Sequence, residues 1–177
     1  MRITKDKVYF WAGPLGNWSR VKGGILLPDE LTECVGMKSV RVPTSEHVFM
    51  FLKARFFGDI EIGKQIIEAP DPKTAKKLGR AVKGFDEEKW KWNRENIMWT
   101  ALILRYQYDE KFRDYLAKEE FKGRHFVEAN PYDIVWSCGY LEDDPRIDLP
   151  GESWPGLNLL GKLLNKLRDQ NVNYGEQ

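Results

Sequence analysis

The stretch "VPTSEHVFMFLKARFFGD", Val42 to Asp59, predicts a capped helix that carries two charges on its apolar face. Thr44 or Ser45 offers a hydroxyl that can cap the first turn. The apolar run continues to about Phe57, and Gly58 supplies the left-handed residue that commonly ends a helix. We therefore expect a helix of about three turns here.

One face of this helix carries two charges among apolar side chains. Glu46, Phe49, Met50 and Lys53 follow the i, i+3, i+4, i+7 spacing of a single helical face. Glu46 and Lys53 are two turns apart, roughly 10 Å along the axis, so a direct ion pair would be strained. Both charges can reach solvent or other partners at the domain edge. Alternatively, the face borders a cleft where the carboxylate and the ammonium address different parts of one ligand, and burial beside Phe49 and Met50 favours a protonated glutamate.

The rest of the chain predicts a few strands and several helices. Strands are expected at Lys7–Gly13, Gly23–Pro28, Lys38–Pro43 and Arg124–Asn130. Further helices are expected after the cap Asp71, over Asp86–Tyr108, over Asp109–Glu119 and over Leu157–Gln170, with a short helical turn opened by Asn130 and Pro131. This order indicates a mainly helical α+β protein with a small sheet, organised as a single domain over residues 1–177 whose tail, residues 171–177, is frayed.

Composition narrows the class of protein. Lys plus Arg number 28 and Asp plus Glu number 27, so the net charge of +1 provides no strong field for long nucleic acids or anionic membranes. The absence of a leader-like start and of a long apolar run predicts a cytoplasmic protein without a membrane partner. With two distant cysteines, Cys34 and Cys138, and two histidines, neither a disulfide framework nor a metal site is indicated, and no cofactor is expected. The oligomeric state does not follow from the sequence.

Three further groups of residues suggest ligand binding, each with a structural alternative. Arg80 follows a helix that carries Lys73, Lys76 and Lys77, a pattern suited to phosphate but also to a solvated basic face. In "FVEANPYDIVWSCG", Glu128, Asp133 and Trp136 can surround the anomeric carbon of a sugar, or can serve backbone capping and core packing. In "WPGLNLLGKLLNKLR", Gly156 and Asn158 precede a helix whose first N–H groups can bind an anion, although both residues also punctuate helices.

Taken in order, these segments resemble the NADAR superfamily of YbiA-like proteins from about Val8 to Arg168. The resemblance rests on "NWS" at Asn17 to Ser19, on "TSEH" with a lysine seven residues after its glutamate, and on "LGR". It continues through Trp90 with "NRENIMWTAL", the "VE" and "YD…W" box, and "GLNLLGKLLNKLR".

The resemblance implies an α+β fold and hydrolysis of an N-glycosidic bond to ribose. Members of the family act on phosphorylated ribosylamino intermediates of riboflavin synthesis or remove ADP-ribose from guanine in nucleic acid, so the implied partner is a ribosyl phosphate or an ADP-ribose-bearing substrate. By matching positions, Glu46 is the leading catalytic carboxylate, with Asp133 and Lys53 as further catalytic candidates. The implied substrate-binding residues are Asn17, Trp18, Arg80, Trp90, Glu128, Trp136, Gly156 and Asn158.

The sequence also departs from the family pattern. Gly16 stands in the position of a serine, and Arg105 and Tyr106 replace "KF". The usual "WGxG" is "WSCG" here, with Ser137 and Cys138, and the loop from Tyr140 to Pro155 is long. These changes spare the charged residues but bear on substrate identity. The rival interpretations are a non-catalytic module that binds ADP-ribose or NAD and, more weakly supported, a structural partner protein.

Overall fold

The computed structural model describes residues 1–172, with side chains described through residue 170. The chain forms two compact units, one of residues 17–110 and the other of residues 1–16 with the chain from residue 111 onward. We call them the helical unit and the strand unit. Seven α-helices and two small sheets among the described residues confirm the mainly helical α+β fold. No helix of this part of the chain combines the length and apolarity needed to cross a bilayer.

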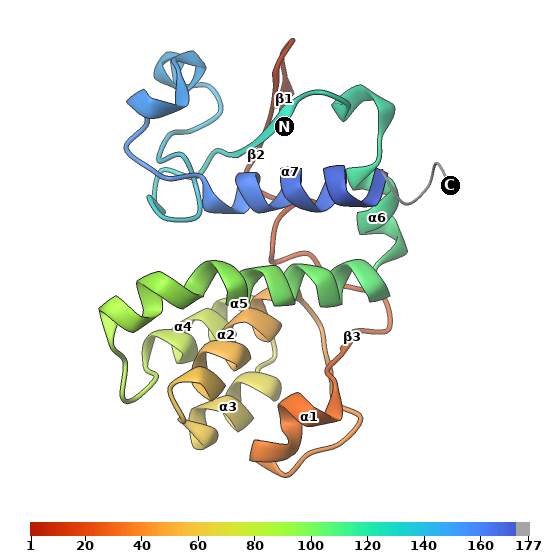
Figure 1. The fold of residues 1–177 in the computed structure, drawn as a ribbon, viewed down its shortest axis with the longest axis vertical. Helices are drawn as coiled ribbons and strands as arrows, with labels where there is room; N and C mark the ends of the chain where they lie inside the picture. The colour runs from red at the N-terminus through yellow and green to blue at the C-terminus, as the bar shows by residue number, and fades with distance from the viewer. Residues whose placement is uncertain (173–177) are drawn as a thin grey trace. The chain divides into compact units, whose positions relative to one another are not determined.

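The helical unit is built around α2 (Ser45–Phe56), the helix expected from the opening stretch. It packs against α3 (Ile60–Ile67), α4 (Pro72–Arg80) and α5 (Glu87–Tyr108), as Figure 1 shows. Because neighbours lie on several sides, every residue from Ser45 to Leu52 is buried, including the polar ones. The same unit holds α1 (Asp29–Thr32), η1 (Glu33–Val35) and a two-stranded antiparallel sheet of β3 (Ile25–Leu26) and β4 (Arg41–Val42).

Local capping explains why the helices begin where they do. Thr44 accepts a hydrogen bond from the His47 N–H at the start of α2, Asp71 accepts one from Thr74 at the start of α4, and Asp86 accepts one from Lys89 at the start of α5. Gly58, with φ of 75°, follows the end of α2. These boundaries confirm the predicted starts because capping depends on only a few consecutive residues.

Helix α3 has no counterpart among the predicted elements. Asp59 caps it through the Ile62 N–H, and its buried residues Gly63, Ile66 and Ile67 follow helical spacing. Gly63 lies on this buried face, against α2: a Cβ at this position would be 3.6 Å from the Phe51 ring. A glycine in the apolar face weakens the periodic signal, and the cap at Asp59 was the remaining clue.

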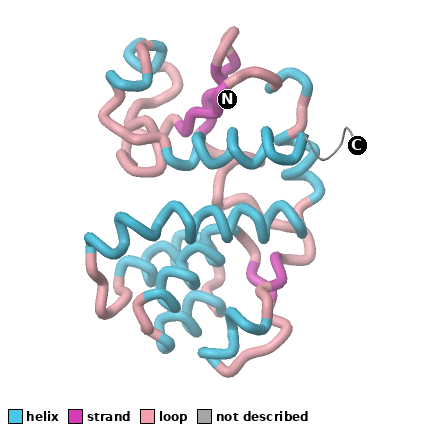
Figure 2. Tube along the Cα trace, viewed as in Figure 1, coloured by secondary structure: helices cyan, strands magenta, loops and turns pink. Residues whose placement is uncertain are grey.

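The strand unit contains a three-stranded sheet in the order β1–β2–β5. Strand β2 (Lys7–Phe10) pairs antiparallel with β1 (Arg2–Ile3) and parallel with β5 (His125–Glu128), with Phe10 opposite Glu128. Helix α7 (Leu159–Val172) packs on β5, and Figure 2 shows how short the strands are beside it. The unit also holds α6 (Glu110–Leu116) and the short 3-10 helices η2 (Glu119–Phe121), η3 (Pro145–Asp148) and η4 (Gly151–Ser153).

The long loop from Tyr140 to Pro155 is tied to the first two strands. Arg2 makes two hydrogen bonds to the Asp148 carboxylate, at 3.0 and 2.9 Å, and its guanidinium lies 4.3 Å from the Tyr9 ring centroid. The Tyr9 hydroxyl donates to Asp148 at 2.8 Å, and the partners Arg2 and Tyr9 lower the pKa of Asp148. Ile147 is fully buried beside Tyr9 in the core of this unit. The loop therefore has its own tertiary anchor.

Three sequence expectations need correction. The strands predicted over residues 23–28 and 38–43 shrink to two residues each, because pairing extends only from Ile25–Leu26 to Arg41–Val42. No helical turn follows Asn130 and Pro131; instead the Asn130 side chain accepts a hydrogen bond from the Tyr132 N–H, which closes a local turn. Helix α7 extends to Val172, while residues 173–177 of the predicted tail lie outside the described part. The single domain over residues 1–177 stays a prediction.

We expect Gly79→Ala to lower the free energy of unfolding by about 1–3 kcal/mol. A Cβ at this buried position of α4 would overlap the Met50 side chain on α2, so the two helices would have to separate or Met50 would have to move. The matched control is Gly63→Ala in α3, where the new methyl group meets only ordinary contacts. Urea unfolding monitored by circular dichroism measures both changes, and an equal effect of the two would contradict the close approach of α2 and α4.

Candidate functional site

Glu46 lies in the first turn of α2 and is 5% exposed. Its backbone N–H donates to the Asn17 carbonyl at 3.1 Å, and the neighbouring Ser45 hydroxyl donates to the same carbonyl at 3.1 Å. The side chain of Asn17 is engaged as well, through Ser45 and the sulfur of Met98. The partially positive end of the helix favours a carboxylate at this position. Asn17, predicted to bind substrate, thus holds the turn that carries Glu46; its binding role stays a prediction.

His47 fixes the same turn from the other side. Its Nε2 lies 3.1 Å from the Ala69 carbonyl, which can only accept, so Nε2 carries the proton. Nδ1 then accepts from the Thr44 hydroxyl at 2.7 Å. Burial lowers the pKa of His47, which favours the neutral ring that this arrangement requires. The first turn of α2 is therefore held by hydrogen bonds on both sides of Glu46.

Lys53 occupies the last turns of α2, and its ammonium points at α4. Nζ donates to the Gly79 carbonyl at 2.8 Å. The same atom lies 4.5 Å from the Phe85 ring centroid and 5.2 Å from that of Trp90. Burial lowers the pKa of Lys53, and the charge of Arg80 lowers it further. The cation is thus held by a carbonyl and two rings while a second cation lies near it.

Neither Lys53 nor Arg80 has a carboxylate partner within the described residues 1–170. Arg80 is exposed at the end of α4. Two cations close enough to affect each other's charge, without an acid between them, repel each other in the free protein. A bound anion such as a phosphate group would relieve that repulsion, and the guanidinium suits its geometry.

Trp90, predicted to line the pocket, belongs to a packed set of rings. Its ring centroid lies 5.5 Å from that of Phe49 and 6.2 Å from that of Phe57. The same ring contacts the Lys53 ammonium. Trp18 differs, since it is 48% exposed in the segment before β3. The helical unit therefore gathers Lys53, Arg80 and Trp90 around the end of α2, and places Asn17 at its beginning.

In the strand unit, Asn158 connects the start of α7 to β5. Its side-chain oxygen accepts from the Glu128 N–H and its side-chain nitrogen donates to the Phe126 carbonyl, both at 3.0 Å. Asn158 has φ of 51°, a left-handed conformation that asparagine tolerates. Gly156 is required nearby, because a Cβ there would overlap the backbone of Ser137 and Cys138. Asn158 thus holds the backbone of Glu128, and Gly156 allows the chain to pass close to Ser137 and Cys138. The predicted contact of Gly156 and Asn158 with substrate stays a prediction.

Asp133 and Trp136 lie in the loop after β5. One oxygen of Asp133 accepts from the N–H groups of Val135 and Trp136, at 3.0 and 2.9 Å. The Ser137 hydroxyl bonds to two backbone groups that precede it in the chain. It accepts from the Asn130 N–H at 2.7 Å and donates to the Glu128 carbonyl at 2.6 Å. The strand unit therefore gathers Glu128, Asp133, Trp136, Gly156 and Asn158 in one hydrogen-bonded region.

The departures from the family pattern fit the structure without disturbing these groups. A side chain at Gly16 would meet its neighbours at 3.4 Å or more, so the usual serine would have room there. Arg105 is buried at the end of α5 and pairs with Asp109 at 3.1 Å. Cys138 is buried, and burial raises the pKa of its thiol.

Sequence reasoning missed two residues that contribute to the arrangement around Lys53. Gly79 entered the sequence analysis only as part of the motif "LGR", although its carbonyl accepts a hydrogen bond from the Lys53 ammonium. Phe85 was not singled out, although its ring lies closest to that ammonium. The signal available for Phe85 was its position between Gly84 and the cap Asp86, where an apolar residue has no helical face to fill.

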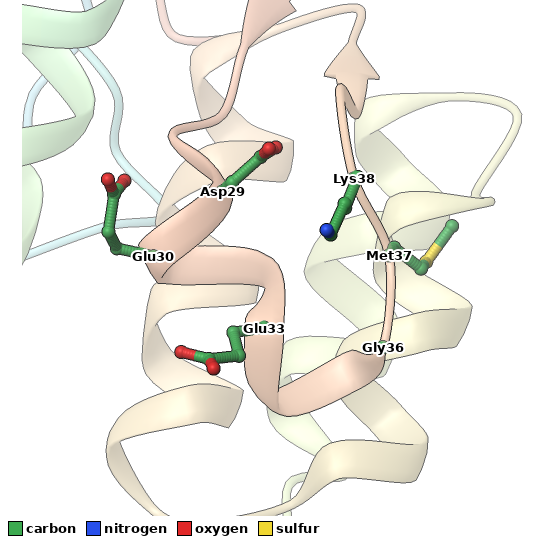
Figure 3. A pocket seen from close by; sticks show the side chains of 6 residues that line it. All are labelled: Asp29, Glu30, Glu33, Gly36, Met37 and Lys38. Carbon is green, nitrogen blue, oxygen red and sulfur yellow. The ribbon is translucent and has the colours of Figure 1, made fainter.

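A hollow of about 340 Å³ lies elsewhere in the helical unit, beside α1 and η1. Figure 3 shows the residues that line it, Asp29, Glu30, Glu33, Gly36, Met37 and Lys38. It contains none of the predicted site residues. The predicted site residues of the helical unit and those of the strand unit therefore all lie outside this hollow.

The fold and these residues define an α+β protein whose central helix carries a buried carboxylate and an ammonium that has no acidic partner among the side chains described, residues 1–170. A sequence model of the NADAR domain matches residues 9–170, and the chain belongs to this family, as the motifs indicated.

Two relatives are similar over most of this chain. Protein irg-1 of Caenorhabditis elegans is 30% identical over 135 residues, which cover 75% of this chain and 62% of that protein. N-glycosidase R617 of Acanthamoeba polyphaga mimivirus is 33% identical over 128 residues, which cover 72% of this chain and 74% of that protein. The chain thus spans less than two thirds of the length of irg-1 and about three quarters of that of R617.

We expect Arg80→Gln to raise the pKa of Lys53 toward its ordinary value, because the substitution removes the nearby positive charge. The pKa is measured by an NMR titration of the Lys53 ε-carbon in protein labelled with 13C-lysine. Lys77→Gln, an exposed position on the same helix, serves as the matched control. An unchanged Lys53 pKa in the Arg80 variant would contradict the proximity of the two cations.

Ser137→Ala should lower the free energy of unfolding by about 1–3 kcal/mol, since it removes the hydrogen-bond partner that Ser137 gives to the half-buried Asn130 N–H and Glu128 carbonyl. Ser153→Ala removes an exposed hydroxyl and should change little. Urea denaturation of both variants measures the difference. Similar values for the two would show that the Ser137 hydroxyl does not hold the loop.

Proposed function

We propose that this NADAR-family protein is an N-glycosidase that hydrolyses the bond between ribose C1 and a base nitrogen in a phosphorylated ribosyl substrate. The observation that carries the proposal is the pair of cations, Lys53 and Arg80, on helices that pack directly on each other. Neither has an acidic partner among the described residues, so an anionic ligand group supplies the missing charge. A ribosyl phosphate or the diphosphate of ADP-ribose carries such a group.

Hydrolysis requires a carboxylate near the sugar and a cation for its phosphate. As the C1–N bond breaks, its electron pair moves to the nitrogen and positive charge develops on the sugar ring. In this proposal Glu46 accepts a proton from the attacking water, whose oxygen bonds to C1. The departing nitrogen takes up a proton from solvent water, and Glu46 later releases its proton to solvent. Lys53 and Arg80 hold the phosphate oxygens during this step. The family and a relative named an N-glycosidase support this reaction type.

Two substrate classes fit the proposal, ADP-ribose linked to guanine in nucleic acid and the ribosylamino intermediates of riboflavin synthesis. Both place a phosphate group on a ribose whose C1 bears nitrogen. The rival function, a module that binds ADP-ribose or NAD without cleaving anything, uses the same cations. Product formation distinguishes catalysis from binding, and the identity of the product distinguishes the two substrates.

We expect Glu46→Gln to reduce kcat by about 100-fold or more while ADP-ribose affinity stays within a few fold, because the amide cannot take a proton from water. Mass spectrometry of products, after incubation of wild type and variant with each substrate class, measures turnover. Glu61→Gln, an exposed glutamate on α3, is the matched control and should retain wild-type turnover.

Equal turnover by wild type and the Glu46 variant would remove Glu46 from the reaction. ADP-ribose binding without any product from either substrate class would favour the binding module. Asp133→Asn in the same assay tests the prediction that this carboxylate shares the acid–base work.

A further inference from the structure

Phe85 is a large apolar residue that remains 45% exposed, outside any helix or strand. It follows Gly84, which has a left-handed backbone conformation with φ of 70°, and precedes Asp86, the N-cap of α5. Its ring nevertheless makes a specific contact, 4.5 Å from the Lys53 ammonium. Phe85 packs on Phe57 as well, with ring centroids 5.3 Å apart, and the contact with a cation adds an attraction that an aliphatic side chain could not supply.

The rings around Lys53 support one another. Phe57 lies between Phe85 and Trp90, with centroid distances of 5.3 and 6.2 Å, and Phe49 contacts Trp90 from α2. The Gly79 carbonyl completes the surroundings of the ammonium at 2.8 Å. We call Phe85, Trp90 and the Gly79 carbonyl the lysine cradle.

From this geometry we infer that Phe85 and Trp90 are positioning residues, which hold the Lys53 ammonium in one orientation beside Arg80. A carboxylate would also have held the ammonium, but it would have neutralised its charge. Aromatic faces and a neutral carbonyl attract a cation and leave its net charge unchanged. The cradle therefore presents a full positive charge to an anionic ligand while restricting where that charge lies.

This inference also changes the role expected for Trp90. The Trp90 ring contacts Phe49, Phe57 and the Lys53 ammonium, so in this inference it acts on the ligand through Lys53. Its kinetic consequences rest on the proposed function, in which Lys53 holds the substrate phosphate. The geometry of the cradle does not depend on that function and is tested separately.

The kinetic test uses Phe85→Leu, which keeps an apolar side chain and removes the aromatic face. We expect kcat/KM for the ribosyl phosphate substrate to fall about 10-fold, and ADP-ribose affinity measured by calorimetry to fall similarly. Phe85→Tyr retains the ring and should restore both values to within about twofold. Phe56→Leu is the matched control. Phe56 is 40% exposed and its ring centroid lies 4.9 Å from that of Phe57, but its ring has no contact with the Lys53 ammonium.

The geometric test is an NMR spectrum of protein labelled with 13C-lysine, with the Lys53 signal assigned by Lys53→Arg. Protons above an aromatic face are shielded, so the Lys53 ε-protons should resonate upfield of those of exposed lysines. Phe85→Leu should move them downfield, while Phe85→Tyr and Phe56→Leu should leave them in place.

A Lys53 signal that does not move in Phe85→Leu would overturn the inference, as would equal losses in Phe85→Leu and Phe56→Leu. If wild type cleaves neither substrate class, the proposed function fails, and the NMR shift together with ADP-ribose affinity still decides whether the cradle positions the cation. If wild type is active and Phe85→Leu matches it in both assays, the cradle is wrong while the proposed function stands.

Discussion

The burial of charged residues on α2 is the constraint that organises the helical unit. Glu46 is buried in the first turn of this helix, and Lys53 is half-buried near its end. A buried charge destabilises a protein unless other groups satisfy it. For Lys53 the satisfying groups are the Gly79 carbonyl of α4, the Phe85 ring just before α5 and the Trp90 ring in the first turn of α5. The positions of α4 and α5 and the stabilisation of this ammonium group therefore depend on each other. Gly79 permits this arrangement because it lets the backbone of α4 approach Met50.

The strand unit solves a related problem with polar side chains that bind backbone groups. Asn158 continues the hydrogen bonding of β5 from the start of α7, and Ser137 joins the two ends of the loop that follows β5. Buried polar groups of the backbone are costly when left without partners, so these side chains stabilise an irregular segment that contains Asp133 and Trp136. Several residues of the family motifs thus hold the backbone that carries other motif residues.

Much of this could be predicted where the signal is local. The caps Thr44, Asp71 and Asp86 each accept from an N–H group three residues away, and the helices that they start were expected at those places. Helix α3 was missed because Gly63 interrupts its apolar pattern, although the glycine is where Phe51 approaches. Strand lengths were overestimated at β3 and β4 because a strand ends where its pairing partner ends, and the partner is not visible in a local pattern.

The sequence by itself determined the family, the existence of helix α2 and the placement of Glu46 and Lys53 two turns apart on it. Only the tertiary structure decided what surrounds each charge. Lys53 binds a carbonyl 26 residues away and lies against Phe85 and Trp90, farther still along the chain, and no spacing rule connects them. The physical reason is that helical periodicity places side chains on a face, whereas the partners of that face are set by which other helices can approach it closely.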